Sequence, residues 1–350
     1  MKSQITMKDM AAHFGVSLNT IHKAIYGKPG ISEATREKIL TFAEENGYQR
    51  NTMAAILKRK HLNIAVCLPQ SEENSRYFYQ DIWDGCRKYL KEWEDLNIQT
   101  REIPFSEGSL SPILADLAEE CRDLKSIDGL LTIPPKDASG MAALHTLTEK
   151  GVTVVFVTED NPQCSRIGAV VGDYYAAGNL MGEQICNILK PQSRICLMTG
   201  DRQNAAHCQV AQGFREYMRS HAPDHDIYDL YGYYKSEQLD EKILNVLTKD
   251  PPDAVLSVFA RGSAVLYKAL HESNMAGIIP AIANDIFPEN VAALNNGTFM
   301  NLIFKDPYRQ AYLATKMLCE YLVKDTIPEK AVKQVEIRLI FRSNLKYYCY

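Results

Sequence analysis

The stretch TMKDMAAHFGVSLNTIHKAI, residues 6–25, decides how the chain begins. Thr6 and Asp9 match a capping box, in which two side chains bind the free backbone N–H groups at a helix start. Gly15 is suited to end that helix, and Ser17 is suited to cap a second one from Leu18 to Ile25. Two short helices joined by a tight turn that contains glycine are typical of a helix-turn-helix.

A third helix is predicted after Pro29. Ser32 is its expected N-cap, Ile39, Leu40 and Ala43 are its expected inward side chains, and Gly47 is its expected end. The first 48 residues therefore predict a small all-α domain. The alternative is the unrelated three-helix start of an enzyme.

Residues 49–61 form a linker with helical character. Asn51 is a possible cap for a helix through Ala54 and Leu57, and the basic run Lys58–Lys60 follows. A helix this short is unstable alone in water, so it needs a partner surface on which to fold.

The charge is distributed unevenly along the 350 residues, whose formal net charge is −4. Residues 1–61 contain ten Lys and Arg against five Asp and Glu, and the remaining residues contain 29 against 38. A basic head on an acidic body favours a polyanionic partner for the head.

Cysteine usage and hydropathy give expectations about compartment. The nine cysteines are scattered without a CxxC pair, and there is neither an export signal nor a run of eighteen apolar residues. We expect a cytoplasmic protein with reduced cysteines, no metal and no cofactor.

The body, residues 62–350, alternates apolar strand-like runs with amphipathic helical segments. The expected strands are Asn63–Leu68, Gly129–Ile133, Val152–Val157, Ala169–Val171, Arg194–Met198, Ala254–Phe259 and Pro280–Ala283. This alternation predicts two doubly wound parallel sheets with a ligand cleft at the carboxyl ends of their strands. We expect one subdomain from about residues 62–171 and 299–330, and a second from about residues 172–298 and 331–350.

The whole arrangement resembles the lactose/galactose repressor family of bacterial regulators, with a body of the periplasmic-binding-protein type. The resemblance rests on Met7–Ala11, Gly15–Ser17, Thr20–Ile21, Thr35–Ile39, Gly47–Tyr48, the linker residues Asn51, Ala54 and Leu57, and the body residues Gly172, Asp173, Gly178, Gly213, Phe214, Asp285 and Pro307–Val323.

The resemblance implies a homodimeric repressor on a near-palindromic operator, with the second helix in the major groove. Its base-reading residues would be Leu18, Asn19, His22 and Lys23. The other implied DNA contacts are Thr6, Ser17, Thr20, Lys28 and Ser32 in the head, and Asn51, Ala54, Leu57 and Lys58 in the linker. Leu57 matches the family's minor-groove wedge, and the alternative is that it packs against its own domain. His22, Lys23 and Arg50 depart from the common pattern, so the family's operator sequence does not transfer.

The implied effector residues are Tyr77, Phe78, Asp160, Val210, Arg261, Asp285 and Lys305. Sugar-binding relatives usually carry Arg at the position of Val210, Asn-Asp at Ala260-Arg261 and often Gln at Lys305. The cleft has thus lost an Arg at Val210 and gained cations at Arg261 and Lys305. These two cations suggest an anionic sugar derivative, because charges without partners are costly in a closed cleft. Two alternatives remain: Asp285 neutralises Arg261 and the ligand is a neutral sugar, or Tyr77–Tyr79 is helix core.

Two other classes of protein are alternatives to a regulator. A transport solute-binding protein of the same fold needs an export signal and no DNA-binding head. An enzyme is disfavoured because GxGxxG, Walker, GxSxG and HExxH motifs are absent from the sequence. His207 and Cys208 are adjacent, so on a helix they point about 100° apart and make a poor nucleophile pair.

Overall fold

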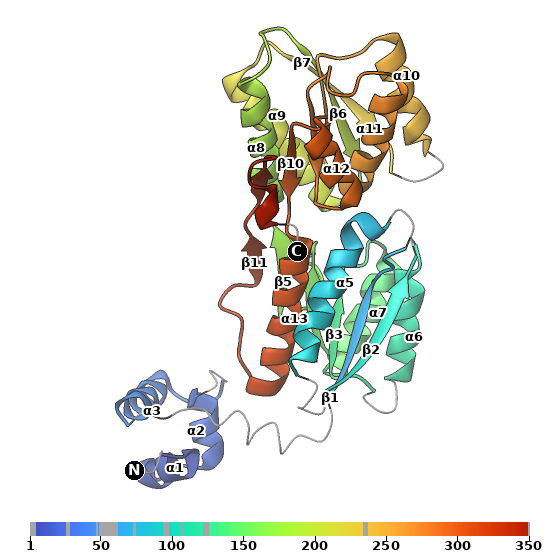
Figure 1. Cartoon of the computed structure of the whole chain (residues 1–350). Coiled ribbons are helices and arrows are strands. Elements are labelled where there is room, and N and C mark those ends of the chain that lie inside the picture. The colour runs from blue at the N-terminus through green and yellow to red at the C-terminus, as the bar shows by residue number, and fades with distance from the viewer. Residues whose placement is uncertain are drawn as a thin grey trace. The chain divides into compact units, whose positions relative to one another are not determined.

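The computed structural model describes residues 5–25, 29–46, 48, 62–72, 75–93, 98–106, 108–121, 126–233 and 237–348. The chain divides into two compact units (Figure 1). One unit consists of residues 1–61 with Cys319–Pro328, and the other of residues 62–318 with 329–350.

The first unit contains the expected three head helices. They are α1 (Met7–Phe14), α2 (Leu18–Ile25) and α3 (Glu33–Glu45). The capping box at the start of α1 is present, and Gly15 ends that helix with a φ of 61°, in the left-handed region. The three helices enclose a small core centred on Met10, Ile21 and Ile39, all fully buried.

The third helix corrects one expectation. Ile39 and Ala43 point inward, but Leu40 is 41% exposed. Adjacent residues on a helix are about 100° apart, so the turn that buries Ile39 and Ala43 directs Leu40 outward. Asn46 is the C-cap of α3, and Gly47, the expected end, lies outside the described residues.

The body contains two six-stranded sheets. The first has the order β11-β5-β4-β3-β1-β2, and the second has the order β12-β10-β9-β8-β6-β7. Every pairing is parallel except that of β12 with β10. The strands are β1 (Leu62–Pro69), β2 (Ile98–Phe105), β3 (Gly129–Thr132), β4 (Thr153–Val157), β5 (Gly168–Gly172), β6 (Arg194–Gly200), β7 (Asp226–Tyr231), β8 (Ala254–Ser257), β9 (Ala281–Asn284), β10 (Asn301–Phe304), β11 (Val332–Val335) and β12 (Arg338–Ile340).

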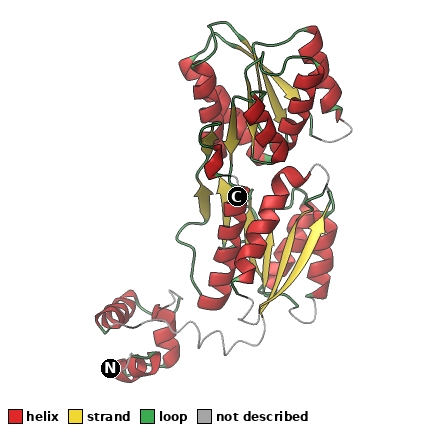
Figure 2. Ribbon diagram, in the orientation of Figure 1, coloured by secondary structure: helices red, strands yellow, loops and turns green. Residues whose placement is uncertain are grey.

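Helices connect and flank these strands, as Figure 2 shows. They are α5 (Arg76–Lys91), α6 (Leu110–Glu120), α7 (Ala138–Glu149), α8 (Tyr174–Cys186), α9 (Ala205–His221), α10 (Leu239–Lys249), α11 (Ala260–Glu272), α12 (Pro288–Asn296) and α13 (Pro307–Lys324), with a short 3-10 helix at Leu345–Tyr347. Within the described part of the chain, every helix is too short or too polar to span a lipid bilayer.

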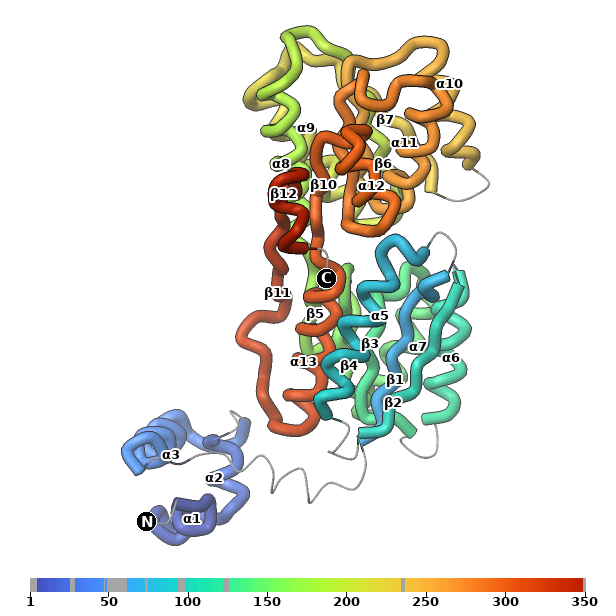
Figure 3. The backbone as a smooth tube through the Cα atoms, in the orientation of Figure 1, coloured from blue at the N-terminus to red at the C-terminus, as the bar shows by residue number. Residues whose placement is uncertain are grey.

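The chain passes from one sheet to the other three times, a path that can be followed in Figure 3. The first crossing follows Gly172, close to the expected Val171. The second follows Phe304 rather than residue 298, because β10 pairs with β9 in the second sheet. The third follows Val335 rather than residue 331, because β11 pairs with β5 in the first sheet. Both crossings lie a few residues beyond the expected positions, because the sequence pattern had identified neither β10 nor β11 as a strand. β11 is a partly exposed edge strand and lacks a continuous apolar run.

Helices α8 and α9 pack closely through two glycines. A Cβ at Gly178 would overlap the backbone oxygen of Val210, and a Cβ at Gly213 would overlap that of Tyr175. Val210 therefore lies buried in this interface and not in the cleft, which corrects its expected effector role. The hydrophobic pattern of α9 predicts that such a residue is inward, but not which inward surface it reaches.

Candidate functional site

The exposed face of α2 is the candidate DNA interface. Leu18 is 48% exposed although it is a large apolar residue, Asn19 is exposed, and His22 and Lys23 are partly exposed. The buried side chains of the same helix are Ile21, Ala24 and Ile25. Helical spacing therefore places the four expected base-reading residues on one outward surface.

Hydroxyl groups fix the helix starts in the head. Ser17 Oγ accepts the backbone N–H of Thr20 at 3.1 Å, and Ser32 Oγ accepts that of Thr35 at 3.2 Å. Thr6 forms the corresponding capping box with Asp9. The expected DNA contacts Thr6, Ser17 and Ser32 thus lie at helix N-termini, where backbone N–H groups favour anions.

Arg36 on α3 was not predicted as part of this site. Its Nη1 donates to the backbone oxygens of Lys23 at 3.0 Å and of Ala24 at 3.4 Å. A cation at the last carbonyls of α2 satisfies unpaired acceptors and complements the helix dipole. Arg36 is therefore a positioning residue for α2, a role that no local sequence signal distinguishes from a solvated surface arginine.

Five expected DNA contacts lie outside the described residues. They are Lys28, Asn51, Ala54, Leu57 and Lys58.

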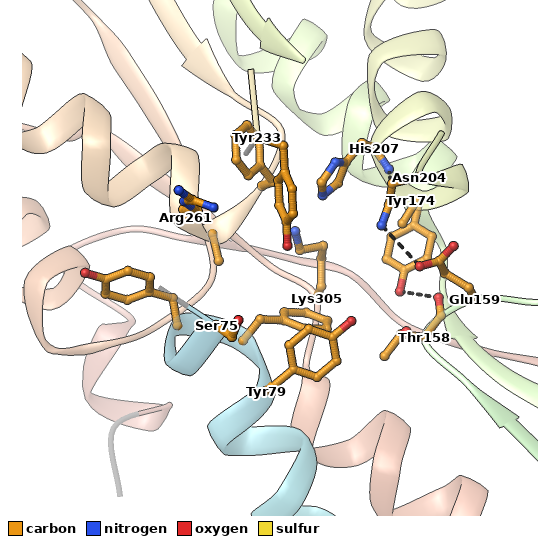
Figure 4. Close-up of a pocket in the computed structure, with 15 residues that line it drawn as sticks. Ser75, Tyr79, Thr158, Glu159, Tyr174, Asn204, His207, Tyr233, Arg261 and Lys305 are labelled. Carbon is orange, nitrogen blue, oxygen red and sulfur yellow. Dashed lines mark hydrogen bonds between the residues drawn. The ribbon is translucent and has the colours of Figure 1, made fainter. Parts of the chain in front are cut away.

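A cavity of about 60 Å³ lies between the two sheet subdomains of the body. Its lining comes from the start of α5, the ends of β4 and β8, the starts of α8, α9 and α11, and the residue after β10. Figure 4 shows Tyr79, Tyr174, Tyr233, His207, Arg261 and Lys305 around it. Tyr77, Phe78, Arg261 and Lys305, which the sequence singled out, all line this cavity.

Lys305 is neutralised by Asp285. Lys305 Nζ lies 2.9 Å from Asp285 Oδ2, and the two side chains are only 6% and 1% exposed. Burial raises the pKa of Asp285, and the neighbouring ammonium group opposes that rise. The alternative in which Asp285 neutralises Arg261 is wrong, and Asp285 does not line the cavity. The sequence could not pair these residues because they end different strands, β9 and β10.

Arg261, among the described residues that line the cavity, is a cation without an acidic partner. Its guanidinium lies 5.6 Å from the centre of the Tyr233 ring. Among the described residues, no carboxylate lies within ion-pairing distance of it. The cavity therefore has one fixed positive charge available to a ligand.

His207 supplies a neutral hydrogen-bond donor, which the sequence did not indicate. Its Nδ1 accepts the backbone N–H of Asp201 at 3.1 Å, which assigns the ring proton to Nε2. Burial lowers the pKa of His207 well below its usual value, and the charges of Lys305 and Lys136 lower it further. The adjacent Cys208 is exposed, and its Sγ contacts the backbone oxygen of Arg202.

Thr158 and Glu159 form the opposite wall, where the sequence predicted Asp160. Glu159 accepts a hydrogen bond from Asn204 at 3.1 Å, and burial raises its pKa. Thr158 has a φ of 66°, a strained conformation for a β-branched residue. Its backbone oxygen accepts a hydrogen bond from the Tyr174 hydroxyl at 2.7 Å. Asp160 instead pairs with Arg166 and does not line the cavity, because the turn after β4 directs it away.

An exposed helix-turn-helix face on one unit and a lined cleft in the other define a DNA-binding protein with a ligand-binding body. Residues 6–51 match the model described as "Bacterial regulatory proteins, lacI family", and residues 64–326 match "Periplasmic binding protein domain". The chain belongs to the lacI family of regulators and is a DNA-binding transcriptional regulator.

Individual relatives agree with this assignment. The chain is 24% identical to the HTH-type transcriptional regulator DegA of Bacillus subtilis over 78% of this chain and 77% of that protein. It is 20% identical to Catabolite control protein A of Priestia megaterium over 98% of this chain and 99% of that protein. A crystal structure of a putative LacI transcriptional regulator from Bacteroides fragilis superposes with a TM-score of 0.69, at 17% identity over 83% of this chain and all of that one. At this identity, the structural likeness shows the fold alone.

Proposed function

We propose that this regulator is a cytoplasmic repressor that binds a near-palindromic operator as a homodimer. A carbohydrate-derived ligand, bound in the cleft, controls its affinity for the operator. We infer that the protein acts by binding DNA and a ligand, and that it is not an enzyme. Its relative DegA is named as a transcriptional regulator. One head alone buries little surface, so two heads on two half-sites give the specificity that a regulator needs.

The observation that carries the ligand proposal is the composition of the cavity. Among the described residues, aromatic rings surround Arg261, which has no acidic partner, and His207, whose Nε2–H is a neutral donor. Aromatic faces pack against the apolar faces of sugar rings, and convergent polar groups fix orientation. Because Lys305 is already paired with Asp285, a single negative group on the ligand is enough to balance Arg261.

The position of the cavity supports a coupling mechanism. Its walls come from both subdomains, so a ligand that contacts both walls stabilises one relative arrangement of the two sheets. A ligand shifts such an equilibrium only by its difference in affinity between the arrangements. In this way, occupancy of the cleft controls affinity for DNA.

The test compares Arg261→Gln with wild type. A thermal-shift screen of neutral sugars, sugar acids and sugar phosphates on the full chain identifies ligands, because a ligand stabilises the state that it binds. Calorimetry then measures affinity, and operator binding is measured with and without ligand. We expect Arg261→Gln to weaken an anionic ligand about tenfold to a hundredfold while the unliganded operator affinity stays unchanged.

The matched control is Arg219→Gln on the exposed face of α9, which does not line the cleft. If Arg261→Gln binds the ligand as wild type does, the role of Arg261 is wrong. If the ligand that controls operator binding carries no negative charge, the neutral-sugar alternative is correct.

A further inference from the structure

A second cavity adjoins the first within the body. It has a volume of about 270 Å³ and shares five lining residues with the smaller one: Ser75, Tyr79, Glu159, Asn204 and Tyr233. We call the smaller space, which contains Arg261, the inner cavity and the larger one the outer cavity.

A hydrogen bond across the cleft joins two of the shared lining residues. Glu159 follows β4 in the first subdomain, and Asn204 precedes α9 in the second. Asn204 Nδ2 donates to Glu159 Oε1 at 3.1 Å, as the dashed line in Figure 4 shows, and both residues line both cavities. Ligand hydroxyls can donate to Glu159 and accept from Asn204 in its place, so the exchange leaves both groups hydrogen-bonded.

The two cavities differ in chemistry. The inner one presents Arg261 without an acidic partner. The outer one presents Lys136, whose Nζ lies 3.5 Å from Asp201 Oδ2, and a second carboxylate, that of Asp137. Hydrogen bonds from Ser111 and Ser139 lower the pKa of Asp137 to about 2, so this carboxylate is ionised. The outer cavity therefore disfavours an anion, and its alternating donors and acceptors suit neutral hydroxyl groups.

The volumes add a size criterion. The inner cavity of about 60 Å³ is much smaller than the roughly 300–1,000 Å³ that is typical of ligand pockets. With the outer cavity of about 270 Å³ included, the space reaches the lower end of that range. The volumes therefore favour a ligand that extends into both cavities.

We infer that the cleft is a two-compartment site for a carbohydrate of two linked sugar units, which replaces the Glu159–Asn204 hydrogen bond as it passes between the cavities. One sugar ring places its acceptor groups at Arg261. The other sugar ring places neutral hydroxyls against Lys136, Asp137 and Asp201. This inference rests on the proposed function and specifies the class of its ligand.

The experiment compares single sugars with their linked dimers on the full chain. The probes are galacturonic acid against digalacturonic acid, glucose against maltose and cellobiose, and galactose against lactose. Calorimetry gives their affinities, and operator binding is measured with each. We expect at least one dimer to bind about tenfold or more tightly than its single sugar and to change operator affinity.

Gln203→Trp tests the outer cavity directly. Gln203 is exposed and lines only the outer of the two, so a tryptophan there obstructs that space without disturbing the core. We expect this variant to lose the preference for the dimer and to keep the affinity for the single sugar. Gln209→Trp, on the exposed surface of α9 and in neither lining, is the matched control and keeps the preference.

The outcomes separate this inference from the proposed function. If single sugars bind as tightly as dimers, or if Gln203→Trp keeps the preference, the two-compartment site is wrong while a carbohydrate-controlled repressor stands. If the chain binds its operator but no probe binds the cleft or changes operator affinity, the proposed carbohydrate function is wrong and this inference falls with it.

Discussion

The DNA-reading face and the ligand cleft are built in opposite ways. The face consists of Leu18, Asn19, His22 and Lys23, all on one short helix and all at least partly exposed. The cleft gathers groups from Ser75 to Lys305, many of them buried, from several strands and helices of two subdomains. A surface on one helix can vary its chemistry with little effect on folding, whereas each polar group of the cleft must also be satisfied by the fold.

The largest expected effect comes from separating the buried ion pair of the cleft. Asp285→Ala leaves the Lys305 ammonium buried without its partner, and we expect a loss of about 3–5 kcal/mol in the free energy of unfolding. Both tryptophans, Trp83 and Trp93, are buried in the body, so their fluorescence during urea unfolding reports on the body.

The double variant Asp285→Ala with Lys305→Met is the control for this prediction. It removes both charges, and we expect it to recover most of the lost stability. If Asp285→Ala lowers the free energy of unfolding by less than about 1 kcal/mol, burial of the Lys305 charge is not costly. The polar groups of the cleft would then depend on the fold no more than those of the DNA-reading face do.

An intermediate effect is expected on the DNA face. Asn19→Ala removes a side chain able to pair with adenine, and we expect operator affinity to fall by about 1–3 kcal/mol. Affinity for random DNA and the unfolding of the body stay unchanged, because Asn19 is exposed on the head. Binding measured at two salt concentrations on both DNAs checks this.

Lys38, on the exposed surface of α3, provides the comparison for Asn19. Lys38→Ala serves as the matched control for Asn19→Ala and is expected to lower operator affinity less. An equal loss for Asn19→Ala on operator and random DNA contradicts a base-reading role for Asn19.

The smallest effect concerns Asp81 on α5. Burial raises its pKa from 3.8 to about 7, and the nearby carboxylates of Asp285, Asp84 and Asp306 add to the rise. The folded state then holds this proton more tightly than the unfolded chain, so the group lowers stability as the pH rises from about 4 to about 7. Because the residue is partly exposed, solvent screens the effect, and we expect Asp81→Asn to gain on the order of 1 kcal/mol at pH 8 and to match wild type near pH 4.

Urea unfolding of wild type and Asp81→Asn at several pH values checks this prediction. Glu72→Gln, which removes a carboxylate from an exposed position of the same subdomain, is the control and should show no such pH dependence. If the difference between wild type and Asp81→Asn is the same at pH 4 and pH 8, the raised pKa of Asp81 is wrong.

The sequence predicted the helices of the head closely because their signals are local. Thr6, Gly15 and Ser17 mark helix ends within a few residues of the positions that they control. The seven expected strands also correspond to strands of the structure, because buried parallel strands are continuous apolar runs. Leu40 was misplaced since an apolar residue beside an inward one need not itself be inward.

What the sequence by itself determined is the order of elements, the outward face of α2 and the presence of chemical groups such as Arg261 and Lys305. Only the tertiary structure decided that Lys305 pairs with Asp285, that Val210 lies between helices, and that Glu159 rather than Asp160 faces the cavity. The physical reason is distance along the chain. A helix face is fixed by backbone geometry over a few residues, whereas the electrostatics of the cleft depend on which strand ends the two sheets bring together.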